Sequence, residues 1–206
     1  MDGPRHCRGP FAIVRRKTSG NDFVTDHSPI KAPVPFQIRP MEKRDLDVIA
    51  EIYGEAVRHG TGSFEIEPPS AIEMASRYQA LVDGGFPYFV AEMGGEVKGF
   101  CYAGPYRPRP AYRKTVEDSV YVAVDARGKG MGEALLSRLI EETERSGFRQ
   151  MLAVIGDSAN AASINLHRKL GFTFVGTVHA VGYKHGEWLD VVTMQKSLGA
   201  GDRQPP

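Results

Sequence analysis

The spacing of hydrophobic residues along the chain predicts an alternation of strands and helices. Strands are expected where apolar and β-branched residues alternate or run together between turn signals, and helices where apolar residues recur every three or four positions. Leu46, Ile49, Ile52, Tyr53 and Val57, for example, fall on one helical face. In chain order, the pattern predicts strands over 36–39, 86–93, 97–103, 116–124, 151–155, 172–178 and 190–196, and helices that open at Asp45, after Pro69, at Gly130 and at Asn160.

Local signals sharpen this pattern. Gly94 and Gly95 separate two predicted strands and indicate a tight hairpin. The run 151–155 is wholly apolar, which is typical of a strand buried on both faces. Because helices occur early, between the central strands and late, the sequence predicts a mixed α/β layer fold.

The two ends of the chain differ from its centre. Residues 1–36 contain five prolines and no sustained period of 2 or 3.6, which predicts a flexible N-terminal extension that ends near the spacer Pro33-Val34-Pro35. Residues 199–206 are expected to form a C-terminal tail. The folded domain is predicted to span residues 37–198.

Composition and charge narrow the classes of function. The chain has 206 residues with 26 Lys and Arg against 25 Asp and Glu, so a formal charge of +1 provides no general field for nucleic acid or an anionic membrane. No apolar run approaches the roughly 20 residues that a membrane helix needs. Cys7 and Cys101 form neither a disulfide framework nor a zinc spacing, and free thiols suit a reducing cytoplasm. We therefore expect a cytoplasmic protein with no metal, nucleic-acid or membrane partner.

The most informative stretch is a glycine-rich turn, Arg127-Gly128-Lys129-Gly130-Met131-Gly132, between a β-branched strand and a helix. Glycines let the backbone approach an anion, and the first N–H groups of the helix have no partner within it, so the turn is a potential diphosphate site. A Walker loop is excluded because no Ser or Thr follows Lys129, and the dinucleotide fingerprint needs a different glycine spacing. A turn that only joins strand to helix remains an alternative.

This turn matches the acyl-CoA signature Arg/Gln-x-x-Gly-x-Gly/Ala and resembles that of the GNAT superfamily of N-acetyltransferases. Longer strings resemble its phosphinothricin and methionine sulfoximine N-acetyltransferase branch: Tyr102-Ala103-Gly104-Pro105-Tyr106, Thr115-Val116-Glu117, Ala153-Val154-Ile155-Gly156 and the hairpin Gly182 to Val191. The similarity covers about residues 37–198. It implies an α/β (α+β) GNAT fold, with a mixed central sheet of about six to seven strands, about four flanking helices and a V-shaped splay between the central parallel strands.

The resemblance also implies acetyl-CoA as the co-substrate, bound in the splay between strands 116–124 and 151–155. The diphosphate is expected on the backbone of 128–133, the pantetheine arm along 120–122, and one N–H there, that of Val122, on the thioester carbonyl. Asn160 matches the family position that forms a hydrogen bond with the pantetheine arm, although an asparagine here also suits the N-cap of the following helix. The implied cofactor-binding residues are Val120, Tyr121, Val122, Arg127, Gly128, Lys129, Gly130, Met131, Gly132, Glu133, Asn160 and Ser163.

Two residues are expected to be catalytic. The acceptor amine must lose a proton before it attacks, and Glu117 matches the carboxylate that the family proposes as the base. A solvated surface glutamate is the alternative. His167 stands where many superfamily members carry a tyrosine that protonates the departing thiolate, and it shares a helix face with Asn160 and Ser163. Its role stays open between second base, thiolate acid, contact to CoA and structural histidine.

The resemblance implies transfer of an acetyl group, by direct attack, to the primary amine of a small amino acid or analogue such as phosphinothricin, methionine sulfoximine or methionine sulfone. Phe64, Arg109, Tyr112 and Tyr121 are the expected substrate-binding residues, although the arginines around Arg109 also suit a solvated loop. The alternatives are acetylation of a protein N-terminus or a polyamine, and a non-catalytic acyl-CoA-binding module. A homodimer is the implied assembly.

Overall fold

Seven strands form one sheet in the computed structural model, which describes residues 35–205, so that the predicted extension lies almost wholly outside the described residues. The order across the sheet is β1-β2-β3-β4-β5-β7-β6. The strands are β1 (Phe36–Pro40), β2 (Tyr88–Met93), β3 (Glu96–Pro105), β4 (Thr115–Val122), β5 (Gln150–Gly156), β6 (Thr173–Lys184) and β7 (Glu187–Ser197). The helices are α1 (Leu46–His59), α2 (Ala71–Asp83), α3 (Met131–Arg145) and α4 (Ala161–Lys169), with short 3₁₀ turns η1 (Lys43–Asp45), η2 (Pro110–Tyr112) and η3 (Val124–Ala126).

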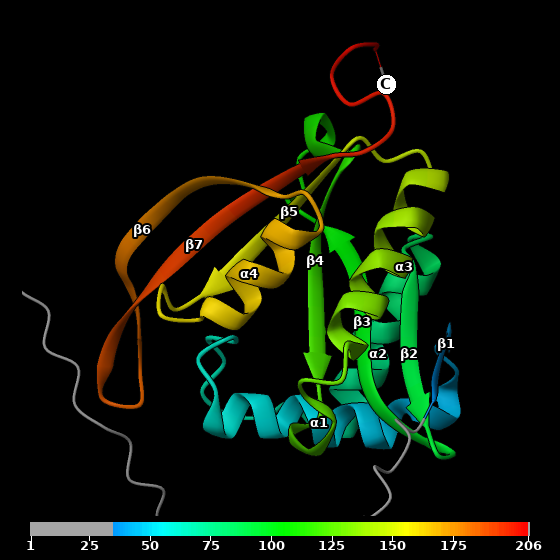
Figure 1. The fold of residues 1–206 in the computed structure, drawn as a ribbon, viewed down its shortest axis with the longest axis vertical. Coiled ribbons are helices and arrows are strands. Elements are labelled where there is room, and N and C mark those ends of the chain that lie inside the picture. The colour runs from blue at the N-terminus through cyan, green and yellow to red at the C-terminus, as the bar shows by residue number, and fades with distance from the viewer. Residues whose placement is uncertain (1–34, 206) are drawn as a thin grey trace, which may run out of the picture. The chain divides into compact units, whose positions relative to one another are not determined.

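All neighbouring strands are antiparallel except β4 and β5. These two pair in parallel over only three positions, the last of which joins Glu117 to Leu152. Beyond this pair the strands diverge, as Figure 1 shows. The expected mixed sheet and the splay between its central parallel strands are therefore confirmed.

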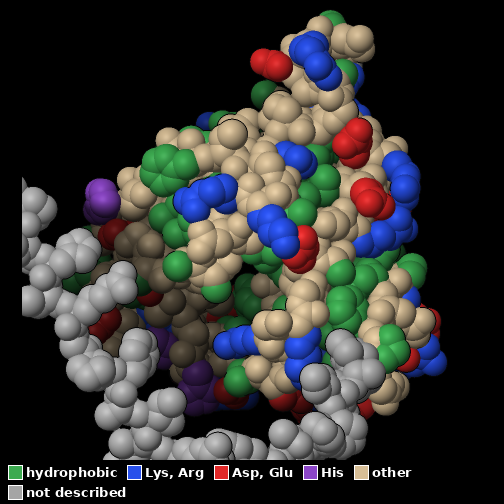
Figure 2. Space-filling view, viewed as in Figure 1, with side chains coloured by type: hydrophobic (Ala, Val, Ile, Leu, Met, Phe, Trp, Pro, Cys, Tyr) green, Lys and Arg blue, Asp and Glu red, His purple; other side chains and the backbone are tan. Residues whose placement is uncertain are grey.

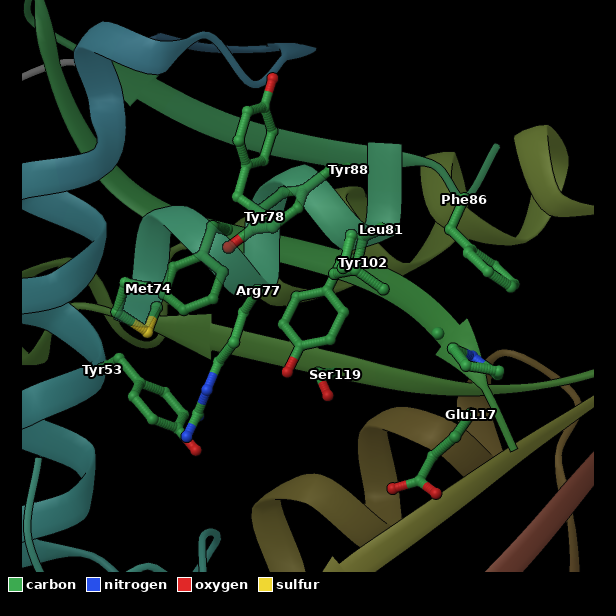
Figure 3. Close-up of a pocket in the computed structure, with 14 residues that line it drawn as sticks. Tyr53, Met74, Arg77, Tyr78, Leu81, Phe86, Tyr88, Tyr102, Glu117 and Ser119 are labelled. Atoms are coloured by element: carbon green, nitrogen blue, oxygen red, sulfur yellow. The ribbon is translucent and has the colours of Figure 1, made fainter. Parts of the chain in front are cut away.

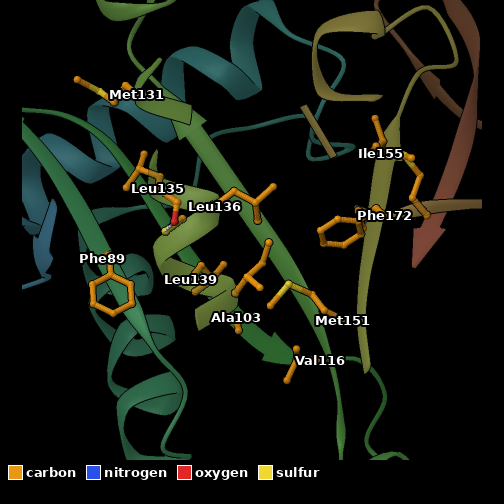
Figure 4. Packing of buried hydrophobic residues seen from close by; sticks show 14 of the residues in the cluster. Phe89, Ala103, Val116, Met131, Leu135, Leu136, Leu139, Met151, Ile155 and Phe172 are labelled. Atoms are coloured by element: carbon orange, nitrogen blue, oxygen red, sulfur yellow. Dashed lines mark hydrogen bonds between the residues drawn. The ribbon is translucent and has the colours of Figure 1, made fainter. Parts of the chain in front are cut away.

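The helices cover both faces of the sheet and create two apolar clusters. On one face, α3 packs Met131, Leu135, Leu136 and Leu139 against β2 to β5, and Phe172 closes the cluster beside β5 (Figure 4). On the other face, α1 and α2 bury Ile49, Ile52, Val57 and Met74 over β2 and β3, with Val90 and Phe100 beneath them. The helix periodicity therefore predicted the buried faces of α1 and α3.

Local sequence explains several element ends. The hydroxyl of Ser70 accepts a hydrogen bond from the Glu73 N–H (3.2 Å) and starts α2 directly after the two prolines. Gly94 and Gly95 have φ of 63° and 83°, values that suit glycine in the tight hairpin between β2 and β3. These two predictions are confirmed.

The sequence placed some features less well. The strand predicted to reach Val124 ends at Val122, because η3 begins at Val124. The two last strands are longer than predicted and form one hairpin, with its turn at His185 and Gly186. Val154 is 38% exposed, so β5 is not buried on both faces. The described residues 199–205 follow β7 as turns, and Arg149 Nη2 donates a hydrogen bond to the Pro205 carbonyl (3.3 Å).

Candidate active site

The divergence of β4 from β5 leaves backbone groups of β4 without a partner strand. The Ala123 N–H donates to the Lys98 carbonyl of β3 (2.8 Å), and with the register this turns the odd-numbered residues of β4 toward β3. The N–H and C=O of Val120 and Val122 therefore face the splay. The backbone of Tyr121 is engaged with β3, which differs from the expectation that it lines the cofactor. An extended ligand with amides can pair with Val120 and Val122 as an added strand does.

The glycine turn lies at the mouth of this splay, at the start of α3. Gly128 and Gly130 have φ of 74° and 80°, and a Cβ at either position would meet no atom within 4 Å. Among the described residues, no acceptor bonds the N–H groups of residues 128–133, whereas the Ala134 N–H already bonds the Gly130 carbonyl (3.1 Å). The turn therefore presents open amides at a positive helix end, which suits a diphosphate.

Cationic side chains surround the turn. Arg127 Nε donates to the Val122 carbonyl (3.1 Å), and Lys129 Nζ donates to the Asp125 carbonyl (2.8 Å). Lys169, at the end of α4, neutralises the Glu133 carboxylate of the first helical turn at 2.6 Å. Figure 2 shows Lys and Arg side chains around the recess between α4 and the start of α3. This charge favours an anion at the turn.

Asn160 caps α4, because its Oδ1 accepts a hydrogen bond from the Ser163 N–H (3.2 Å). The cap interpretation is therefore confirmed. Ser163 in turn offers its carbonyl to the Nδ1–H of His167 (2.7 Å), with the Ser163 hydroxyl at 3.3 Å from the same nitrogen. The three residues do share one face, as their spacing predicted.

His167 forms a buried pair with Asp118 of β4. Its Nε2 lies 3.0 Å from Asp118 Oδ2, and the two side chains are only 5% and 2% exposed. Both ring nitrogens therefore face acceptors, which is the arrangement of an imidazolium. Burial lowers the pKa of His167, but the hydrogen bond and charge of Asp118 outweigh it, and the net pKa is raised. Asp118 Oδ1 is buried and bonds no described group.

Glu117 faces the opposite side of the sheet from Asp118, toward α2, and lines a cavity of about 440 Å³. Burial, with a contribution from the charge of Asp118, raises the pKa of Glu117 to about 7. A carboxyl group with this pKa is half ionised at neutral pH, which suits a general base. Glu117 also belongs to the last pair between β4 and β5, so it stands where the splay opens.

The wall of this cavity is largely aromatic, and the sequence did not predict most of it. In Figure 3, the hydroxyls of Tyr53, Tyr102 and Ser119 and the guanidinium of Arg77 point toward the same space as Glu117. Ser119 lies two residues after Glu117 on the same strand face, so strand alternation could have found it. Tyr53 and Arg77 come from α1 and α2, and no spacing in the sequence connects them to β4.

The expected substrate residues lie around the cavity rather than in its lining. The ring of Tyr121 packs edge-on to Tyr53 and stacks on Phe100, behind the wall. Phe64 contacts the backbone at Gly182 and Gly156.

Arg109 is exposed and precedes η2 in the loop between β3 and β4. Tyr112, in η2, packs edge-on to Tyr106 with ring centroids 5.6 Å apart. The guanidinium of Arg107 lies over both of these rings, 5.0 and 5.9 Å from their centroids. This loop therefore places an arginine and two tyrosines together just before Glu117.

The two sides of the sheet thus offer complementary surfaces. One side has a turn with open amides and an open strand edge, and the other has a partly open cavity, lined in part by aromatic rings, that holds a carboxyl group of pKa about 7. The splay after Glu117 connects them. These features suit a group-transfer enzyme with room for a phosphorylated, amide-containing donor on one side and a small acceptor on the other.

Comparisons with known proteins agree with this class. A family model described as acetyltransferase (GNAT) domain matches residues 38–193. The chain is 48% identical to a phosphinothricin N-acetyltransferase of Alcaligenes faecalis over 82% of this chain and 86% of that protein. It is 43% identical to an L-methionine sulfoximine/L-methionine sulfone acetyltransferase of Pseudomonas paraeruginosa over 78% of this chain and 94% of that protein.

Among solved structures, a GNAT superfamily phosphinothricin acetyltransferase from Sinorhizobium meliloti in complex with AcCoA matches with a TM-score of 0.81 and 47% identity, over 83% of this chain and 92% of that one. The chain belongs to the GNAT acetyltransferase family. It is an acetyl-CoA-dependent N-acetyltransferase.

No helix within residues 35–205 has the length and apolar character needed to cross a membrane. Over the same range, no group of three or more His, Cys, Asp or Glu side chains has an arrangement that could hold a metal ion.

Proposed function

We propose that this enzyme acetylates the primary α-amine of a small amino acid or analogue of the phosphinothricin, methionine sulfoximine or methionine sulfone type. The observation that carries the proposal is Glu117, whose carboxyl group of pKa about 7 lines the cavity at the point where β4 leaves β5. The names of the relatives support the acceptor class.

The residues around the splay fit acetyl-CoA. The amides of residues 128–133 would hold its diphosphate, and Val120 and Val122 would pair with its pantetheine amides. Arg127 and Lys129 add positive charge beside the diphosphate. Acetyl-CoA, when bound, supplies an acetyl thioester. Val122, the residue expected to bond the thioester carbonyl, lies five residues and therefore about 16 Å along β4 from Glu117. We assign the Val120 N–H, nearer to Glu117, as the donor to that carbonyl, where negative charge develops as the amine attacks.

Glu117 is the base in this proposal. An α-amino acid enters mostly as its ammonium form at pH 7, and an attacking amine must be neutral. The ionised Glu117 accepts the proton, directly or through one water molecule, and the apolar and aromatic side chains around it reduce its contact with solvent. The hydroxyls of Tyr102 and Ser119 lie beside it and can orient the amine (Figure 3).

His167 belongs, in our proposal, to the acetyl-CoA side. With Nδ1 bonded to the Ser163 carbonyl and Nε2 to Asp118, it holds protons rather than accepting them, so we do not assign it as the second base. The pair joins β4 to α4 across the splay and so fixes the width of the cofactor slot. His167 could in addition return a proton to the departing CoA thiolate. Comparing thiol release in the Asp118→Asn and His167→Gln variants tests this role.

The carboxylate and the phosphinate or sulfoximine group of the acceptor need planar cationic donors or hydroxyls. We propose Arg109 and Tyr112 for these contacts, from the loop that leads into Glu117. Phe64 would close the pocket from the other side. The cavity volume of about 440 Å³ suits a small acceptor rather than a folded protein surface.

We also propose that two copies of the chain form a dimer through β6, the strand at the edge of the sheet, and β7. Exposed apolar side chains gather on these strands: Phe174, Val175, Val178, Val181, Tyr183 and Trp188. A strand edge with this character pairs readily with a second chain. The buried free thiol of Cys101 is compatible with a reducing cytoplasm, the location we propose.

The proposed function is tested by a screen of free-thiol release. The protein is mixed with acetyl-CoA and, one at a time, with amino acids, phosphinothricin, methionine sulfoximine, methionine sulfone, a polyamine and an N-terminal peptide. We expect release with the small amino-acid analogues. Release only with the polyamine or the peptide would replace the acceptor class, and a melting shift with acetyl-CoA but no release with any amine would indicate a non-catalytic binding module.

A further inference from the structure

Lys184, near the tip of the β6–β7 hairpin, is a buried cation that the proposed chemistry does not use. The residue is 4% exposed, and its Nζ donates hydrogen bonds to the carbonyls of Gly60 (2.8 Å) and Ser63 (2.6 Å). These carbonyls belong to the segment between α1 and α2, more than 120 residues away in the sequence. We call residues 60–65 the pocket loop.

Two glycines of the sheet make room for the same loop. A Cβ at Gly182, two residues before Lys184, would collide with the ring of Phe64. At Gly156, the end of β5, a Cβ would collide with the Thr61 carbonyl and press on Phe64. Thr61 is also tied to the residue that follows β5, because its hydroxyl donates to Asp157 Oδ2 (3.1 Å). The pocket loop is therefore clamped between β5 and the hairpin.

The other end of the loop bonds the wall of the acceptor cavity. The Tyr53 hydroxyl lies 3.2 Å from Ser63 Oγ and donates to Glu65 Oε1 (2.9 Å). Arg77 Nη1 donates to the same Glu65 oxygen (2.7 Å). Tyr53 and Arg77 both line the cavity, so the loop links their positions to Lys184.

Burying an ammonium group lowers the stability of the fold unless hydrogen bonds or an opposite charge compensate for the lost water. Among the described residues, Lys184 has no carboxylate partner, only the two carbonyls, and burial lowers its pKa. An apolar residue of similar size would remove this desolvation cost. However, an apolar side chain cannot donate hydrogen bonds to the carbonyls of Gly60 and Ser63, which belong to a loop without regular secondary structure.

We propose that Lys184 is a positioning residue for acceptor recognition: by holding the Gly60 and Ser63 carbonyls, the β6–β7 hairpin fixes the pocket loop, which in turn sets Tyr53 and Arg77 in the cavity wall. This inference rests on the proposed function, since it assigns the cavity to the acceptor. It extends that function by making the C-terminal hairpin part of the acceptor site.

The test compares Lys184→Met with Lys43→Met, an exposed lysine of η1 on a different element. For the acceptor found in the thiol-release screen, Lys184→Met should raise KM about tenfold or more, because a loosened wall binds the acceptor less well. The kcat and the KM for acetyl-CoA should change less than about twofold, since Glu117 and the glycine turn are untouched. Lys43→Met should match the parent in all three values.

A second readout does not depend on turnover. Amide hydrogen exchange in residues 60–65 should be faster in Lys184→Met than in the parent, while exchange in α3 stays unchanged. Gly182→Ala displaces the same loop through Phe64 without altering any charge, so it should give the same pattern of exchange. If Lys184→Met does not fold, Lys184→Gln takes its place in both assays, because it removes the charge and shortens the reach to the two carbonyls; Gly182→Ala, which also moves the proposed acceptor contact Phe64, reports only on the exchange of the loop.

Unchanged acceptor KM or unchanged exchange of the loop in a folded Lys184→Met protein would overturn the positioning role. An equal rise in the KM for acetyl-CoA would also overturn it, because it would indicate a general structural defect. Failure of the parent to acetylate any acceptor counts against the proposed function instead, and the exchange measurement then still reports on the clamp.

Discussion

Glu117 and Asp118 are consecutive residues with opposite surroundings. Strand alternation turns the Glu117 carboxyl group into the aromatic cavity and the Asp118 carboxylate toward His167. Asp118 has a cationic partner, whereas Glu117 has only burial and a neighbouring negative charge, both of which disfavour its ionised form. Glu117 is thereby suited to accept and release a proton, and Asp118 is suited to stabilise the positive charge of His167.

Replacing Glu117 by Gln should reduce kcat for the acceptor about a hundred- to ten-thousand-fold, because the base is lost while the shape is kept. The KM for acetyl-CoA should stay near the parent value. In the parent, kcat/KM for the acceptor should rise with pH through about 7, and the variant should lack this limb. Steady-state kinetics of the parent and the variant between pH 5.5 and 9 measure the loss of kcat, the KM for acetyl-CoA and the pH dependence.

The stability of the same variant provides a control for folding. The pKa of Glu117 is raised in the folded state, so its ionisation lowers stability as the pH rises from about 4.5 to about 7. Glu117→Gln should therefore be at least as stable as the parent at pH 8. Activity at the parent level in this variant would remove Glu117 from its role.

The Asp118–His167 pair gives a second prediction at the scale of single residues. Because the pKa of His167 is raised in the folded state, the pair stabilises the protein fully below the unfolded pKa of about 6.5 and loses this effect as pH rises through the folded value. Asp118→Asn should lower the free energy of unfolding by about 3 kcal/mol at pH 6 and by less at pH 9. Urea denaturation at both pH values measures this.

His59→Gln is the matched control for that experiment, because His59 is exposed at the end of α1. It should change the unfolding free energy little at either pH. A loss in Asp118→Asn that is equal at pH 6 and pH 9 would show that the charge on His167 does not contribute.

At the scale of elements, the start of α3 and the edge of β4 act together. Each exposes amides for a different reason: a helix start has no preceding turn to bond them, and β4 has lost its neighbour β5 beyond Glu117. Gly130 ends the turn with φ of 80°, a value that a residue with a Cβ adopts only with strain. The left-handed conformation of Gly130 therefore sets the direction in which the backbone N–H groups of the turn point.

Gly130→Ala should destabilise the fold by about 1–2 kcal/mol and weaken acetyl-CoA binding about tenfold, because shifted amides lose bonds to a charged group. Gly95→Ala is the control, since Gly95 has φ of 83° and an equally open surrounding in the β2–β3 turn. Gly95→Ala should lower the free energy of unfolding by a similar amount and leave acetyl-CoA binding unchanged. Thermal unfolding and calorimetric titration with acetyl-CoA distinguish the two effects. Equal binding in both variants would count against the turn as the diphosphate site.

At the scale of the whole molecule, the β6–β7 hairpin has one buried contact and one exposed apolar surface. Its Lys184 reaches inward to the pocket loop, while Tyr183 and Trp188 on the same hairpin are exposed and pack edge-on to each other with ring centroids 5.3 Å apart. A second copy seated on these rings would also hold the hairpin that positions the loop. The proposed dimer and the acceptor site are thus linked through one element.

The dimer is tested with Trp188→Glu, which places a charge in a patch where Trp188 is 67% exposed. The parent should have twice the 22.6 kDa mass of the chain by light scattering, and the variant should shift toward the single-chain mass. Ile72→Glu is the control, because Ile72 is exposed on α2, away from the hairpin. A parent that has the single-chain mass at micromolar concentration would refute the dimer.

The sequence by itself determined the features that depend on neighbouring residues: the periodic elements, the hairpin at Gly94 and Gly95, the open amides from 128 to 133 and the position of Glu117 on its strand. The family strings added the cofactor and the splay. These are local because helix starts, tight turns and strand alternation follow from a few adjacent residues.

Only the tertiary structure decided which distant residues meet. Tyr53 and Arg77 reach the cavity because two amphipathic helices pack over β2 and β3. Periodicity placed Tyr53 on the buried face of its helix, but it marked neither Arg77 nor the approach of either residue to β4. Asp118 meets His167 because α4 folds across the splay, and Lys184 meets the pocket loop across more than 120 residues. Such contacts depend on how whole elements pack, and packing is set by the sum of many weak apolar contacts rather than by any single stretch of sequence.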